Sequence, residues 1–122
     1  MKLPLKDVLK IGQAMKQLEA GGLVLAAPDQ VRWAVARKRV WEFVDPFVAG
    51  IVAEYEKGER NPDNFTAIQL RHLEEINGET VELTLPAPIR MGGVKELPCR
   101  NPPDYEALAN LVGFVFEDIT EG

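Results

Sequence analysis

The chain has 122 residues, of which 46% are hydrophobic and 27% charged, and its formal net charge is −5. This length and balance predict one folded domain, residues 1–122, and exclude disordered and low-complexity classes. With no serine, one cysteine and one histidine, a single chain cannot build a Ser/His/Asp triad, a two-histidine metal site or a CxxC pair. We therefore expect no metal site, no cofactor and no enzymatic activity.

Two helices are predicted in the first half of the chain, after an extended segment at residues 1–5. Apolar residues recur every three or four positions over Lys6–Ala20, and Gly21-Gly22 ends this amphipathic helix. A second, long helix covers Pro28–Lys57, because proline is favoured at the first helical position. A proline inside this helix predicts a kink or a break over Phe43–Pro46.

The second half of the chain mixes helices with short extended segments. The period of the apolar residues changes from 3.6 to 2 after Gly78, which indicates a strand. The predicted fold class is α+β and predominantly helical, with about four helices and a small two- or three-stranded β element. The remaining predicted elements are an apolar connector at 23–26, a third helix over Phe65–Ile76 with Asn64 as its N-cap, a strand at 81–85 continued along an edge at 89–91, a loop at 92–101, a fourth helix from Pro102 and a last strand or apolar tail at 114–116.

Arg37 departs most clearly from a simple amphipathic pattern. On a helical projection it points into the middle of an apolar stripe, and an unpaired buried charge is costly, so it needs a carboxylate or carbonyl partner. Arg37 either belongs to a buried structural ion pair or snorkels to the surface, or it receives an anionic group of a partner. Arg37, Trp33 and Trp41 are therefore the candidate binding residues. The stripe consists of Trp33, Val40, Trp41, Val44 and Val48, and the candidate carboxylates are Glu74, Glu79, Glu82 and Glu106.

Other reactive or basic groups are few. His72 shares a helix face with apolar residues, which is typical of a hydrogen-bonded core or boundary histidine. Cys99 lies in a proline-rich loop beside Arg100, and a Cys99/His72 nucleophilic pair is the thiol chemistry that the composition allows. The segment Arg32–Arg39 and its neighbour Trp41 interleave basic and aromatic residues, as single-strand binding surfaces do, but the negative net charge disfavours a nucleic-acid partner.

The chain carries more apolar residues than one buried face of each helix needs. Val31, Phe43 and Phe47 widen the stripe of the long helix, and Leu9 and Leu70 lie off the main faces of their own helices. Surplus apolar surface on a small protein is typical of an interface. The pattern therefore favours self-association or docking to a protein partner over catalysis.

The order of these elements carries a resemblance to a known family. An opening amphipathic helix, Asp7–Leu18, precedes a long helix with an apolar-Ala-apolar-Ala-Arg pattern at Trp33–Arg37. An acidic helix then leads into Thr80–Leu83, a strand of the Glu-Val-Glu-Leu type, and a closing helix follows. In this organisation the chain resembles an uncharacterised family of small proteins encoded by tailed phages and prophages. The resemblance implies a phage context and carries no chemistry.

These observations predict a non-enzymatic phage or prophage accessory protein that acts through protein–protein contacts, in assembly or against a host factor. The alternative is a binder of a small anionic ligand, such as a nucleotide signal, with Arg37 in a pocket between helices. The apolar runs are far shorter than the ~20 residues of a bilayer span, so we expect no membrane insertion. A lone cysteine is typical of a reducing compartment, which predicts the cytoplasm of a bacterial host, or the virion. Sparse Asn and Gln and absent Ser lean toward a thermophilic source.

Overall fold

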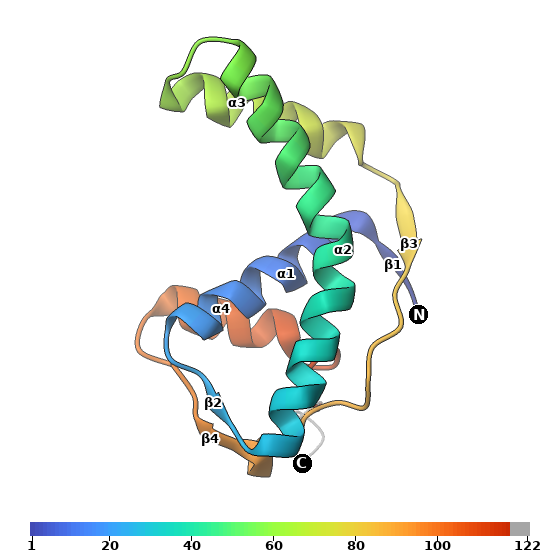
Figure 1. Ribbon diagram of the computed structural model, residues 1–122, viewed down its shortest axis with the longest axis vertical. Helices are drawn as coiled ribbons and strands as arrows, with labels where there is room; N and C mark the ends of the chain where they lie inside the picture. Colours follow the sequence, from blue (N-terminus) through green and yellow to red (C-terminus); the bar gives the residue numbers. More distant parts are fainter. Residues whose placement is uncertain (118–122) are drawn as a thin grey trace.

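The computed structural model describes residues 1–117, which contain four α-helices and four short strands (Figure 1). The predominantly helical α+β class predicted from the sequence is confirmed. The elements are β1 (Lys2–Pro4), α1 (Leu5–Ala20), β2 (Val24–Leu25), α2 (Ala27–Lys57), α3 (Pro62–Glu75), β3 (Thr80–Glu82), the 3-10 helix η1 (Met91–Gly93), β4 (Val94–Glu96) and α4 (Pro102–Leu111).

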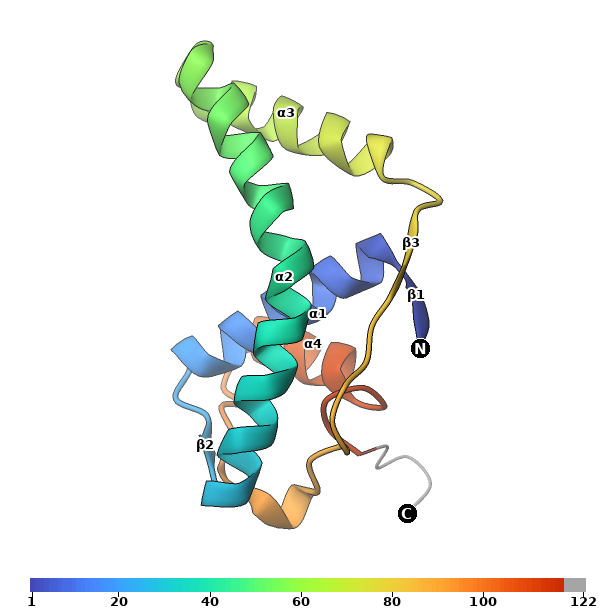
Figure 2. The ribbon, with the colours of Figure 1, turned by 45° about the vertical axis from the view of Figure 1, so that its right-hand side comes forward.

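The helix α1 is central to the arrangement and packs against both α4 and α2. In Figures 1 and 2, α2 passes across α1 and α4 and then continues well beyond them. At the far end of α2 the chain turns back, and α3 packs along this projecting half. The molecule therefore consists of a body built on α1, which includes the first half of α2, and an arm made of the projecting half of α2 and of α3.

The core lies around the inner face of α1. Seven residues of this helix are buried, and Val8, Met15 and Leu18 are fully enclosed. The segment after α4 contributes Phe116, whose ring centroid is 5.9 Å from that of Trp33 on α2. The face of α1 that the sequence marks as apolar is thus the face that the fold buries.

Gly12 allows α1 to approach α2 closely. A Cβ atom at this position would lie 2.7 Å from Val44 Cγ2 and 3.3 Å from Val40 Cγ1, closer than carbon atoms pack. Both valines are buried on α2. Trp41 lies beside the same crossing, 3.8 Å from that Cβ position. The missing side chain of Gly12 therefore leaves the space that the inner face of α2 occupies.

Two separate antiparallel sheets connect the start of the chain to its second half. β1 pairs with β3, with Leu3 opposite Val81, and β2 pairs with β4, with Val24 opposite Glu96. The predicted connector at 23–26 and the predicted loop at 92–101 thus contain β2 and β4. Strands of two or three residues are too short for an alternating pattern to identify them.

The predicted edge strand at 89–91 and the predicted last strand at 114–116 are reduced to isolated bridges. Ile89 pairs with Phe116, which also pairs with Val112. Met91 begins the 3-10 helix η1 instead of extending a strand. Pro86 and Pro88 precede this region and lack the backbone N–H groups that a longer ladder would need.

Asn-Pro pairs begin both α3 and α4. Asn61 Oδ1 accepts a hydrogen bond from the backbone N–H of Asn64 (2.8 Å), and Pro62 takes the first helical position. The N-cap is therefore Asn61 and not Asn64, one turn earlier than predicted. Pro62 can take the first helical position because the backbone N–H there has no partner within the helix. The predicted start of α4 at Pro102, which follows the N-cap Asn101, is confirmed.

Pro46 bends α2 without ending it. The helix is continuous from Ala27 to Lys57, and both views show that its direction changes about half-way along (Figures 1 and 2). A proline removes one backbone hydrogen bond, here the bond to the Glu42 carbonyl. Because Pro46 is exposed, water can solvate that carbonyl. Of the two predicted outcomes, a kink or a break, the bend is found.

Asp104 joins α4 to α1 through a buried carboxylate. Only 3% of the residue is exposed, and its carboxylate accepts hydrogen bonds from Gln17 Nε2 (3.0 Å) and from the Arg100 backbone N–H (3.1 Å). The hydrogen bond from Gln17, and then that from Arg100, lower the pKa of Asp104, although burial acts in the opposite direction. Ionised Asp104 therefore stabilises the packing of α4 on α1.

We expect Gly12→Ala to lower the free energy of unfolding by about 1–3 kcal/mol, because the new methyl group overlaps Val44. Urea unfolding followed by circular dichroism measures this change. Gly92→Ala is the matched control, since no atom lies within 4 Å of the corresponding Cβ position. An unchanged unfolding midpoint for Gly12→Ala would show that the two helices separate at no cost.

The Asp104 carboxylate predicts a loss of stability in acid. The pKa of Asp104 is lowered in the folded state from an ordinary value of 3.8. Its contribution to the free energy of unfolding is therefore complete above about pH 3.8 and disappears as the pH falls through the lower pKa of the folded state. Asp104→Asn should therefore unfold more easily than the parent at about pH 7, and the difference should shrink below about pH 4. Urea unfolding at both pH values tests this, with the exposed Asp45→Asn as the control for loss of one charge. A difference that is equally large in acid would contradict it.

Candidate functional site

Arg37 lies at the edge of the apolar face of α2 and not at its centre. Its side chain is 49% exposed, so the prediction of an inward-facing guanidinium is wrong. The stripe predicted from the sequence omitted Ala36, which is 1% exposed. Including Ala36 rotates the buried face away from Arg37, which is one residue further along and therefore about 100° further around the helix. The guanidinium carbon lies 5.7 Å from the centroid of the Trp41 ring, a cation–π contact.

Glu19 is the carboxylate that pairs with Arg37. Its Oε1 lies 2.9 Å from Arg37 Nε, and it accepts a hydrogen bond from Trp33 Nε1 at 2.7 Å. None of the four predicted carboxylates makes this contact. Glu19 lies in the last turn of α1, shortly before the glycines that turn the chain toward α2, so the short connection between the helices is the signal that could have identified it.

The three predicted binding residues, Arg37, Trp33 and Trp41, are brought together around one shallow hollow of about 560 Å³. Three carboxylates and two cations line this hollow, and one of the carboxylates already pairs with Arg37. Of the two interpretations of Arg37, a structural ion pair or a receptor for an anionic group, this arrangement favours the ion pair. The lining residues are Glu19, Trp33, Ala34, Arg37, Lys38, Trp41, Glu42 and Asp45.

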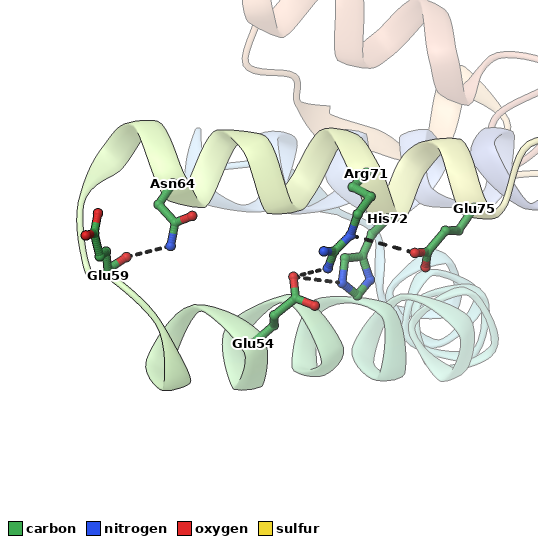
Figure 3. A network of polar contacts seen from close by, with 6 residues as sticks. All are labelled: Glu54, Glu59, Asn64, Arg71, His72 and Glu75. Carbon is green, nitrogen blue, oxygen red and sulfur yellow. Dashed lines mark hydrogen bonds and ion pairs between the residues drawn. The ribbon is translucent and has the colours of Figure 1, made fainter.

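His72 lies between α2 and α3, where Figure 3 shows a cluster of charged side chains. Its side chain is 21% exposed and its Nε2 is 3.7 Å from Glu54 Oε2. The predicted boundary position is thus found, but within residues 1–117 this buried nitrogen has no hydrogen-bond partner. Arg71 pairs with Glu54 and with Glu75 (Nε to Oε1, 3.7 Å). The hydrogen bond from Arg71 is the main cause of the lowered pKa of Glu54.

The structure does not bring Cys99 to His72. Cys99 lies between β4 and α4, in the body, whereas His72 lies on α3, in the arm that projects from the body (Figure 1). Among residues 1–117, no group of three or more His, Cys, Asp or Glu side chains is placed to hold a metal ion.

A second depression, of about 530 Å³, lies where α1 faces the arm. We call it the three-helix groove. Eight of its thirteen lining residues are apolar or aromatic, and the sequence did not mark it as a site, although Leu9 and Phe47 belong to the predicted surplus of apolar residues. The lining residues are Lys6, Leu9, Lys10, Gln13 and Lys16 from α1, Trp41, Val44, Phe47, Val48 and Ile51 from α2, and Phe65, Gln69 and Leu73 from α3.

Comparison of the chain with protein-family models, with curated proteins and with solved structures finds no match. In the part of the chain that the structure describes, no helix is both long enough and apolar enough to cross a membrane. The candidate site therefore rests on the geometry of this chain's own residues.

Replacement of Arg37 and of Trp33 should separate a surface ion pair from a core anchor. Because Arg37 is half exposed, Arg37→Met should change the free energy of unfolding by no more than about 1 kcal/mol. Trp33 is 7% exposed, so Trp33→Ala should cost about 3–5 kcal/mol. Thermal and urea unfolding measure both variants. A loss for Arg37→Met as large as that for Trp33→Ala would show that the guanidinium supports the core.

Proposed function

We propose that this chain is a non-enzymatic interaction protein that binds a protein partner through the three-helix groove. The observation that carries the proposal is apolar surface that the fold leaves uncovered at this place. Val48 is 44% exposed and Phe65 is 36% exposed, and both line the groove. Large apolar side chains that face water beside an apolar depression are typical of interaction sites.

The shape of the fold supports this assignment. The arm extends beyond the body (Figure 2). The groove is lined on one side by α1 and on the other by α2 and α3. Val52, 38% exposed, follows Val48 by one turn of α2 and extends the apolar strip past the groove. A partner that covered this strip would bury side chains from three helices at once.

The resemblance to small tailed-phage proteins remains a prediction. Under this proposal, the partner belongs to phage assembly or to the host. The alternative, a binder of a small anionic ligand, has less support from the charges around Arg37. The three carboxylates in that hollow repel an anion, and Glu19 already occupies the guanidinium.

Paired valine variants test the proposal. Val48→Lys places a charge in the groove, whereas Val31→Lys places the same charge on a valine of α2 that is 64% exposed and outside the groove. Both sites are exposed, so both variants should keep the parent's unfolding free energy to within about 0.5 kcal/mol. In affinity purification from the source cells followed by mass spectrometry, we expect one defined partner to bind the parent and Val31→Lys but not Val48→Lys.

Two outcomes would contradict the proposal. One is a partner recovered equally well by Val48→Lys and the parent. The other is a small anion, such as a nucleotide, that raises the melting temperature of the parent but not of Arg37→Met, which would favour the alternative.

A further inference from the structure

The charged side chains that line the three-helix groove have one sign, while Glu19 and Asp45 line an adjoining hollow that shares Lys16 with the groove. Three lysines, Lys6, Lys10 and Lys16, line the groove, and no carboxylate does, although the chain as a whole has a net charge of −5. All three lysines come from α1 and therefore lie on one wall, facing the apolar side chains of α2 and α3. The groove is thus a positively charged region on an acidic protein.

These lysines are not engaged in ion pairs. Within residues 1–117, none of the three forms a salt bridge, and the one hydrogen bond found is from Lys6 Nζ to Asn77 Oδ1 (3.0 Å, exposed). No other lysine among these residues forms a salt bridge either, whereas Arg37 and Arg71 are paired with carboxylates. Lysine ammonium groups beside an apolar surface can therefore meet carboxylates of a partner without first breaking an internal pair.

We propose that the three-helix groove binds an acidic amphipathic helix of a partner protein, an inference that rests on the proposed function and specifies the chemistry of the partner. The apolar face of such a helix would lie on the side chains of α2 and α3, as in other helix-in-groove complexes. Its flanking Asp and Glu residues would face the lysines of α1. A basic helix is disfavoured because like charges across an interface repel.

The spacing of the lysines favours a helix over a small amphiphile. Lys6 and Lys16 are ten residues apart on α1, which corresponds to about 15 Å along the helix axis. A fatty acid presents one anionic group and needs cations gathered at one point. A helical segment of two to three turns, about 11–16 Å long, presents carboxylates over the same length as the lysines.

A peptide selection on the immobilised full chain tests this inference. The probe is a helical peptide library with leucines fixed at helical spacing and with Glu, Gln or Lys at each flanking position. We expect the selected peptides to be rich in Glu and to bind at least about tenfold more tightly than the same peptides with Lys in place of Glu. Their affinity, measured by fluorescence anisotropy, should decrease as salt is raised.

Charge-matched variants locate the effect. Lys10→Glu/Lys16→Glu should weaken the selected peptides at least about tenfold. Lys57→Glu/Lys95→Glu changes the net charge equally but alters exposed lysines outside the groove, so it should change affinity no more than about twofold. Circular dichroism and thermal unfolding confirm that each variant is folded.

The outcomes separate this inference from the proposed function. Peptides that Val48→Lys no longer binds, but that show no preference for Glu, would overturn the acidic-helix inference and leave the groove as a docking surface. Selection that yields no binder would overturn the acidic-helix inference alone. Binders that both Val48→Lys and Lys10→Glu/Lys16→Glu retain at the parent's affinity would overturn both. Self-association of the parent that Val48→Lys abolishes would assign the groove to a second copy of the chain. Displacement of the selected peptide by a long-chain fatty acid would assign it to a lipid. Either result would also overturn the inference.

Discussion

The close approach of α1 to α2 at Gly12 is the constraint on which the rest of this structure depends. A side chain at this position would occupy the space of Val44, so glycine lets the inner face of α2 pack directly on α1. The same helix α1 also packs against α4. α1 is therefore covered on two sides, and its remaining exposed side, which carries the lysines, becomes the wall of the three-helix groove.

The length of α2 has a different consequence. The body occupies only part of this helix, and the remainder projects with α3 packed along it (Figure 1). Along one edge of the arm, Glu54 of α2 and Arg71 and Glu75 of α3 form a network of ion pairs (Figure 3). Exposed ion pairs of this kind contribute little individually. Beside this network Phe47 packs edge-on against His72, with ring centroids 6.2 Å apart. Phe47 also lines the groove, as does Leu73 of α3.

Charge is distributed unevenly over the molecule. Three arginines of α2 and α3, namely Arg32, Arg37 and Arg71, are paired with carboxylates. The lysines of α1 are not compensated in this way among the described residues, and they adjoin the exposed apolar residues Val48 and Phe65. An apolar surface with a charged rim provides both affinity and orientation to a partner, which is why the groove, and not the hollow around Arg37, is the better candidate for function.

The amino-acid sequence by itself determined the fold class and the presence of four helices, because apolar spacing, prolines at helix starts and glycines at helix ends act within a few residues of each other. The bounds of α1 and α2, to within one residue, and the start of α4 follow from such local signals, and so does the bend associated with Pro46. Only the tertiary structure decided the partner of Arg37, the pairing of β2 with β4 and the existence of the groove. Each of these features joins residues from separate elements. Whether such residues come into contact depends on how closely the helices pack, and the periodicity of apolar residues along one helix does not predict that distance.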